Sequence, residues 1–174
     1  MPLIERIVAN DSKTRFNLIS EPEPASGAPV WWIRANQGHS LKAVADLETT
    51  PILSVSDIPT GVAVHGTTRL AWESIQKEGL SRMKRNHVHL AQGVPGTGVI
   101  SGMRNTSQIY IYIDVEKALA SGLKFELSAN GVILTSGNEE GILPPAFFNK
   151  VVAQDGAVLP LLAVSSKQIT VDDL

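Results

Sequence analysis

The dipeptide Asn130-Gly131 constrains the fold of this chain more than any other local feature. It lies between residues 125–128 and residues 132–135, two short segments with the residue pattern of β-strands. Asn-Gly favours the positive φ angles of the tight turn that joins two antiparallel strands. We therefore expect an antiparallel hairpin at this point of the chain.

Other strand-like segments surround this hairpin. Three of them are clear in the sequence: residues 62–65, 87–91 and 108–113. Two short helices are expected among them, one capped by Thr67 or Thr68 and one capped by Asp114. Because strands outnumber helices, we expect an α+β fold with a split antiparallel sheet rather than a doubly wound parallel sheet.

The beginning of the chain has its own pattern. Residues 2–10 carry apolar residues at helical spacing, and residues 15–19 and 30–34 read as two strands around a turn-rich loop. A helix followed by a hairpin is typical of the end of a winged-helix module. We therefore expect a partial winged-helix lobe at the N-terminal end.

The boundary between two lobes is expected where periodicity is weakest. Residues 47–61 are rich in Thr, Ser and Pro, and we interpret them as a connection between residues 1–46 and 62–174. A length of 174 residues allows one core, or a large lobe packed on a small one. Residues 168–171 have the composition of an edge strand, with no role assigned.

Composition narrows the classes of function. The net charge is -2 and only 18% of the residues are charged, which excludes a chain-wide basic field for long nucleic acids. The chain contains no cysteine, so thiolate nucleophiles and thiolate metal sites are excluded. No apolar stretch approaches the length of a membrane span. We expect a soluble intracellular protein, cytoplasmic or nuclear, that is monomeric and makes no membrane contact.

Two arginines are candidates for binding a phosphate. Arg34 and Arg104 are surrounded in sequence by small, uncharged residues, which is not the pattern of a solvated charged face. A planar guanidinium with few competing carboxylates nearby is suited to bidentate phosphate binding. The alternative, that each is an ordinary surface arginine, stays open at this point.

Three histidines are candidates for contacts with a nucleotide. His65 is expected at a strand end, where Gly66 would let a ligand approach the backbone; the alternative is a buried structural histidine bonded to a carbonyl group. His87 and His89 would share one face of a strand. With no cysteine to complete a zinc site, we expect no metal and interpret an imidazole here as a partner for ribose hydroxyls.

No serine nucleophile with a histidine base is apparent, and no close pair of carboxylates accompanies the histidines. If the chain is an enzyme, we expect its substrates to supply the nucleophile. Its arginines and histidines would then act by positioning and by stabilising charge.

The ordered set of motifs resembles the NAD-dependent RNA 2′-phosphotransferases, a family that removes the splice-junction 2′-phosphate from tRNA. The resemblance covers most of the chain and rests on residues 10–16 (NDSKTRF), 33–40 (IRANQGHS), 64–67 (VHGT), 87–91 (HVHLA), 100–104 (ISGMR) and 128–135 (SANGVILT).

This resemblance implies a fold and a reaction. The fold would be a winged-helix remnant joined to an ADP-ribosyltransferase-like lobe. In the family, the RNA 2′-phosphate attacks the nicotinamide ribose of NAD and expels nicotinamide, and the ribose 2″-hydroxyl then attacks the phosphate. The products are 2′-hydroxyl RNA and ADP-ribose 1″,2″-cyclic phosphate. The substrate would be tRNA or another RNA with an internal 2′-phosphate.

The resemblance also implies roles for individual residues. Arg34 and Arg104 would hold and polarise the phosphate as the catalytic pair. The NAD site would be lined by residues of four motifs: His65, Gly66, Thr67, His89, Leu90, Ser101, Gly102, Asn130 and Val132.

One part of the family pattern is absent from the sequence. Family members carry an upstream Arg-His dipeptide that completes the catalytic set, and no Arg-His dipeptide occurs in these residues. We therefore expect a chain that lacks the N-terminal part of the RNA-binding lobe. Two alternatives follow: transfer of ADP-ribose to phosphorylated nucleic-acid ends without the second step, and a non-catalytic module that binds NAD or RNA.

Overall fold

Two four-stranded antiparallel sheets form the larger part of the protein. They are seen in a computed structural model that describes residues 1–40, 48–97 and 102–162. One sheet has the strand order β12-β11-β7-β4 and the other has the order β3-β8-β9-β6. The α+β class with antiparallel sheets and few helices is therefore confirmed.

The elements run along the chain as follows: α1 Pro2–Ala9, β1 Phe16–Pro22, β2 Pro29–Ala35, β3 Thr49–Ile52, the 3-10 helix η1 Val55–Asp57, β4 Val64–Thr67, α2 Arg69–Glu78, β5 Leu80–Ser81, β6 Val88–Leu90, β7 Ile109–Ile113, α3 Val115–Ala120, β8 Phe125–Ser128, β9 Ile133–Thr135, β10 Ile142–Leu143, the 3-10 helix η2 Pro145–Phe147, β11 Phe148–Ala153 and β12 Val158–Leu159.

The expected hairpin around Asn130-Gly131 is present. Strands β8 and β9 pair antiparallel, and Gly131 adopts a φ of 76° in the turn between them. Its backbone N–H donates to the carbonyl oxygen of Ser128 at 2.9 Å, which closes the turn. The sequence signal therefore predicted both the strands and the left-handed backbone that joins them.

The two sheets meet where β4 lies beside the end of β6. Backbone hydrogen bonds run in both directions between Val64 and Ala91, at 2.9 and 2.8 Å. Strand β4 was expected at residues 62–65 but begins two residues later, so that His65 pairs with Ile111 inside the strand instead of lying at its end. This places His65 and His89 on neighbouring strands of different sheets.

The helices follow from local capping. The Thr68 side chain accepts a hydrogen bond from the Ala71 backbone at 3.2 Å and begins α2, while Gly79 ends it with a φ of 93°. The Asp114 carboxylate accepts from the Lys117 backbone and begins α3. Trp72 of α2 packs against Phe148 with ring centroids 6.3 Å apart, which fixes the helix on the sheet that contains β11.

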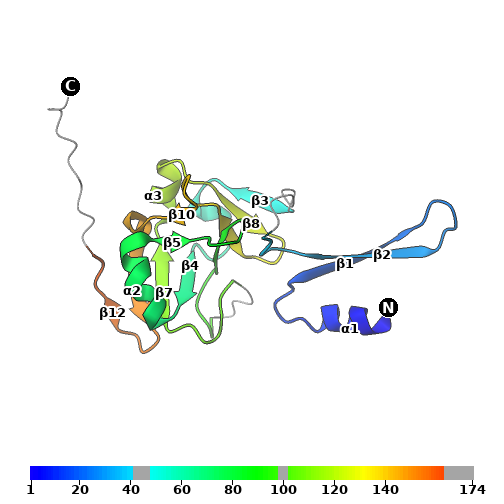
Figure 1. Cartoon of the computed structure of the whole chain (residues 1–174), viewed down its shortest axis with the longest axis horizontal. Helices are drawn as coiled ribbons and strands as arrows, with labels where there is room; N and C mark the ends of the chain where they lie inside the picture. Colours follow the sequence, from blue (N-terminus) through cyan, green and yellow to red (C-terminus); the bar gives the residue numbers. More distant parts are fainter. Residues whose placement is uncertain (41–47, 98–101, 163–174) are drawn as a thin grey trace, which may run out of the picture.

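Helix α1 and the hairpin β1–β2 extend away from the rest of the molecule (Figure 1), and we call residues 1–40, which include them, the arm. The expected helix and both expected strands are present, with β1 and β2 in register from Phe16–Ala35 to Pro22–Pro29. No residue of α1 is buried. We call the remaining described residues, 48–97 and 102–162, the body.

The segment expected to connect two lobes has regular structure. Within residues 47–61, strand β3 pairs with β8 of the body, and Ile52 and Ile58 are each 2% exposed in its core. Pro51 and the small polar residues masked this strand in the sequence. Most of the segment thus belongs to the body, while the division into lobes stays a prediction.

Two sequence-based expectations concern other parts of the chain. The edge strand expected at residues 168–171 lies outside the described residues. In the part of the chain that the structure describes, no helix is both long enough and apolar enough to cross a membrane.

Candidate functional site

His65 and His89 lie together where the two sheets meet. The His65 Nδ1–H donates to the carbonyl oxygen of His89 at 2.9 Å, which leaves Nε2 of the neutral ring as an acceptor. Burial lowers the pKa of His65, and the hydrogen bond to His89 raises it by a smaller amount. A hydrogen bond to a carbonyl group is what the alternative interpretation, a buried structural histidine, requires. The same bond also fixes the orientation of the ring and leaves Nε2 available.

The His89 side chain is neutral near physiological pH. Burial lowers its pKa to about 4, and the positive charge of Arg85 and the electrostatic effect of His87 act in the same direction. Its Nε2 atom is buried and has no hydrogen-bond partner among the described residues. A buried polar atom without a partner is costly, so this nitrogen marks a place where a ligand atom can bind.

Three glycines make room around these histidines. A Cβ on Gly66 would approach the Met103 Sδ and the Ser107 Oγ to 2.5 Å, and a Cβ on Gly102 would approach the Ala91 Cα to 2.8 Å. Gly38, which follows β2, lies close to the His89 side chain, because a Cβ on it would be 3.8 Å from Nε2. The loop 102–107, the end of β2 and β4 are therefore held close together by residues without side chains.

The remaining expected NAD-site residues fall into two groups. Asn130 is half-buried beside Ser128, whose hydroxyl donates to the Asn130 Oδ1 at 2.9 Å, and Thr67 is half-buried at the end of β4. Leu90 and Val132 are fully buried, so their side chains are not accessible to a ligand in this structure. Ser101 lies outside the described residues.

The two candidate arginines are both exposed, but their surroundings differ. Arg34 forms an ion pair with Glu48, a carboxylate that lies fourteen positions further along the chain and that sequence proximity did not indicate. Arg104 begins the turn that the Ser107 N–H closes on its carbonyl oxygen at 3.1 Å.

Two further polar side chains border this region, and neither was among the site residues expected from the sequence. The Nδ1 of His39 and the Oε1 of Gln92 are buried and have no partner among the described residues. The Gln92 Nε2 donates to the carbonyl oxygen of Gly131 at 2.9 Å, which aims its side chain at the β8–β9 turn. His39 lies within the IRANQGHS motif, which was the only signal for it.

His87 differs from His89 although it is only two residues away. It precedes β6, so the expected pair on one strand face is only partly present. Burial lowers its pKa, against an opposing contribution from the Glu126 carboxylate. In the described ranges no group of three or more His, Asp or Glu residues is arranged to hold a metal ion.

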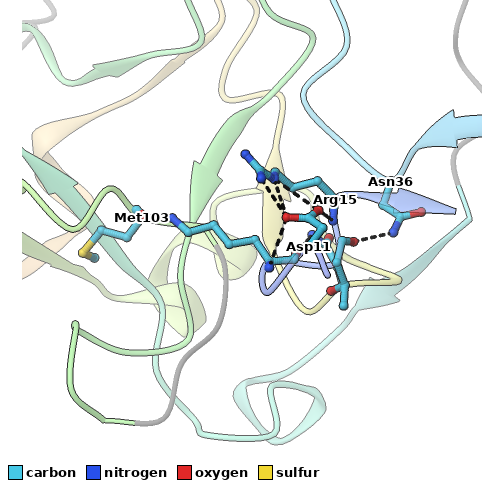
Figure 2. Close-up of polar contacts among 7 residues, drawn as sticks. Asp11, Arg15, Asn36 and Met103 are labelled. Atoms are coloured by element: carbon cyan, nitrogen blue, oxygen red, sulfur yellow. Dashed lines mark hydrogen bonds and ion pairs between the residues drawn. The ribbon is translucent and has the colours of Figure 1, made fainter. Parts of the chain in front are cut away.

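The loop 11–15 of the arm contacts this region. The Lys13 ammonium donates to the carbonyl oxygen of Met103 at 2.9 Å, and Figure 2 shows the ion pair of Asp11 with Arg15 in the same loop. The carbonyl oxygen of Lys13 accepts a hydrogen bond from the Asn130 Nδ2 at 3.1 Å. The arm is thus joined to two of the loops that carry expected site residues.

The order of these motifs matches a known family. Residues 1–137 match the family model described as RNA 2′-phosphotransferase, Tpt1 / KptA family. The chain belongs to this family.

Relatives from animals and yeast agree with this assignment. The chain is 48% identical over 148 residues to a tRNA 2′-phosphotransferase 1 of Danio rerio, covering 84% of the chain and 64% of that relative. It is 45% identical over 150 residues to the Homo sapiens protein of the same name, covering 86% of the chain and 57% of the relative. A tRNA 2′-phosphotransferase of Saccharomyces cerevisiae is 38% identical over 156 residues, with 87% and 63% covered. The chain therefore spans less than two thirds of the length of each.

Proposed function

We propose that this chain transfers the splice-junction 2′-phosphate of tRNA, or of another RNA, to NAD-derived ADP-ribose. The products would be 2′-hydroxyl RNA, nicotinamide and ADP-ribose 1″,2″-cyclic phosphate. Membership of the RNA 2′-phosphotransferase family supports the reaction class. The structural observation that carries the proposal is the buried, unpartnered Nε2 of His89 beside the fixed ring of His65.

The residues present fit a dinucleotide such as NAD. Its ribose hydroxyls both donate and accept hydrogen bonds, and the neutral rings of His65 and His89 offer nitrogens that suit them. Glycines at positions 66 and 102 let the loop 102–107 pack closely against β4 and Ala91, where a Cβ would collide with its neighbours, and so keep this loop beside the two histidines. His65, Gly66, Thr67, His89, Gly102 and Asn130 would hold the nucleotide, while Ser101 and the buried Leu90 and Val132 are included on the family pattern alone.

NAD would supply the ADP-ribose that accepts the phosphate, and nicotinamide would leave. Arg34 and Arg104 would bind the phosphate oxygens and stabilise the negative charge that grows on them during transfer. For Arg34 this requires release of Glu48, an exposed partner whose ion pair is worth little in water. His65 and His89 stay neutral, so they orient hydroxyl groups without repelling a cationic nicotinamide ring.

The fold supports the same assignment. We interpret the arm as the end of a winged-helix module that contacts RNA, and the body as an ADP-ribosyltransferase-like lobe. The arm has the expected order of helix and hairpin, and the body has the split antiparallel sheet. The expected monomer and the cytoplasmic or nuclear location stay predictions.

A direct assay tests the proposal. The chain is incubated with NAD and a synthetic oligonucleotide that carries one internal 2′-phosphate. The products are separated, and their molecular masses and amounts are measured. We expect dephosphorylated RNA and ADP-ribose cyclic phosphate in equal amounts. An oligonucleotide that gains the mass of ADP-ribose and keeps it would support the alternative reaction on phosphorylated nucleic acids. Binding of both substrates without nicotinamide release would support a non-catalytic module.

Substitution of the arginines tests their role. Arg34→Ala and Arg104→Ala should each lower kcat by about 10²- to 10³-fold, because each removes a charge-assisted contact to the reacting phosphate. The thermal midpoint should stay within a few degrees, since both residues are exposed. The control is Lys124→Ala, which removes an exposed positive charge directly before β8, at the end of this strand that lies away from the β8–β9 turn. Full activity of Arg104→Ala would refute the assigned role.

A further inference from the structure

Hydrogen bonds of Lys13, in the loop 11–15, join the arm to the body. The shape of this loop is set by Asp11, whose carboxylate accepts hydrogen bonds from the backbone N–H groups of Lys13, at 3.4 Å, and Arg15, at 2.6 Å. The Arg15 guanidinium also pairs with it at 2.7 Å (Figure 2). These hydrogen bonds and this charge lower the pKa of Asp11 to about 2, so the carboxylate stays ionised and holds the loop at working pH.

The same loop is also held within the arm, by hydrogen bonds to Asn36, which follows β2. The Asn36 side chain donates to the carbonyl oxygen of Thr14 at 2.7 Å, and the Asn36 backbone donates to the carbonyl oxygen of Arg15 at 2.8 Å. Thr14 has a positive φ of 44°, an unusual backbone for a β-branched residue. The loop therefore has a defined shape that presents Lys13 toward the body.

The Lys13 side chain ends on the loop that carries Arg104. Its ammonium donates to the carbonyl oxygen of Met103 at 2.9 Å, and this contact crosses from the arm to the body. The Met103 side chain packs over Gly66, and Ser107, at the far end of the turn, is 3% exposed. Because Arg104 directly follows the carbonyl that Lys13 holds, the position of its backbone depends on this contact.

The Lys13 backbone makes a second contact with the body. Its carbonyl oxygen accepts from the Asn130 Nδ2, while the Asn130 Oδ1 accepts from the Ser128 hydroxyl. One arm residue therefore joins the loop 102–107 to the β8–β9 turn. These are loops of different sequence regions, and each carries residues assigned to the phosphate site or to the NAD site.

We propose that Lys13 is a positioning residue that sets Arg104 and Asn130 relative to each other by bridging their two loops. This inference rests on the proposed phosphotransferase function. Lys13 does not need to touch a substrate: its ammonium is occupied by the Met103 carbonyl. Its effect on the reaction passes through Arg104.

The experiment compares Lys13→Met, Lys13→Arg and wild type, with Lys124→Met as the matched loss of an exposed lysine. Removal of the ammonium should lower kcat by about 10- to 100-fold, the range expected for a lost charge-assisted hydrogen bond. The KM for NAD should change little. Lys13→Arg keeps a cationic donor and should recover most of kcat. The thermal midpoints of these variants should agree within a few degrees.

A double substitution separates positioning from an independent role. If Lys13 acts through Arg104, the pair Lys13→Met with Arg104→Ala should be about as slow as Arg104→Ala alone. Multiplied losses in the double variant would overturn the inference, and so would an unchanged kcat in Lys13→Met. An arginine variant that recovers nothing would argue equally against it.

Hydrogen exchange distinguishes failure of this inference from failure of the proposed function. An inactive wild-type chain would refute the proposed function, and exchange can still be measured on that chain. Loss of the Lys13 contact should speed exchange of the Ser107 amide, which closes the turn on Arg104, while the amides of β7 keep their protection. Unchanged Ser107 exchange in Lys13→Met would show that Lys13 does not hold this loop.

Discussion

The body of the protein buries its apolar side chains, whereas the arm exposes them. Every buried apolar residue of the described chain lies between Ile52 and Ala153, in the body. The arm exposes a row of large apolar side chains on its helix and its hairpin: Leu3, Ile4, Ile7, Phe16, Ile19, Val30, Trp32 and Ile33. The two regions are similar in pattern in the sequence, yet only one of them contains a core.

This difference shows that amphipathic spacing predicts an element without predicting its burial. A two-stranded hairpin alone is marginal in water, so the arm cannot gain its order from its own apolar contacts. It is ordered by the β1–β2 ladder and by hydrogen bonds to the body, including those of Lys13 and the His39 carbonyl, which accepts from the Asn86 backbone.

The largest contrast is expected between two isoleucines. Ile111 is fully buried in β7, and Ile111→Ala should lower the free energy of unfolding by about 2–5 kcal/mol, because it leaves a cavity. Ile33 is 54% exposed in β2, and Ile33→Ala should change it by about 0.5 kcal/mol or less. Denaturant titration of both variants measures the difference. Equal losses would mean that the arm has a core in solution.

A second prediction concerns the close packing at Gly66. Gly66→Ala should cost about 1–3 kcal/mol, because the new methyl group would collide with the Met103 side chain and the Ser107 hydroxyl. It should also lower activity by displacing the loop that carries Arg104. Gly27→Ala is a suitable comparison in the arm, since nothing lies within 4 Å of its Cβ position, although its φ of 70° adds some backbone strain. A Gly66→Ala variant with wild-type stability would contradict this close packing.

Acid should weaken the body through His89. Its pKa is about 4 in the folded protein and about 6.5 when unfolded, so the unfolded state binds a proton first as the pH falls. The stabilisation is complete above pH 6.5 and is lost as the pH falls toward 4, by on the order of 3 kcal/mol. Thermal midpoints of wild type and His89→Gln between pH 7 and 4.5 measure it. Parallel curves for the two proteins would contradict it.

The smallest effect is expected at the ion pair between Arg34 and Glu48. Both side chains are well exposed, so Glu48→Gln should change the free energy of unfolding by less than about 1 kcal/mol. It should strengthen binding of a 2′-phosphorylated oligonucleotide a few-fold, because the phosphate no longer competes with a carboxylate. Fluorescence titration at low and moderate salt measures this. Weaker binding in Glu48→Gln would argue that Glu48 helps to orient Arg34 for the phosphate.

Sequence patterns predicted the elements that local signals define. Capping by Thr68 and Asp114 and the Asn130-Gly131 turn depend on neighbouring residues, and all three are present. Strand β3 was missed because its partner β8 is distant in sequence and because Pro51 argues against a strand. The two-residue shift of β4 has the same cause, since its limits are set by pairing with β7 and Ala91.

The candidate site was predicted only in part for a similar reason. The glycines and histidines were apparent as motifs, but the partner of each depends on how distant segments fold together. The Arg34–Glu48 pair and the contact of Lys13 with Met103 join residues whose association no local spacing indicates. The assigned catalytic and NAD-binding roles themselves stay predictions.

The double contact made by Lys13 has a consequence for protein engineering. An arm taken from one relative and fused to the body of another would need to bring Asp11, Lys13 and Arg15 with it, because the hybrid must remake both contacts from a single residue. Grafts that cut between Arg15 and Phe16 would separate the hairpin from the loop that attaches it. A fusion point after Asn36 would transfer helix, loop and hairpin together with the Asn36 hydrogen bonds that hold the loop.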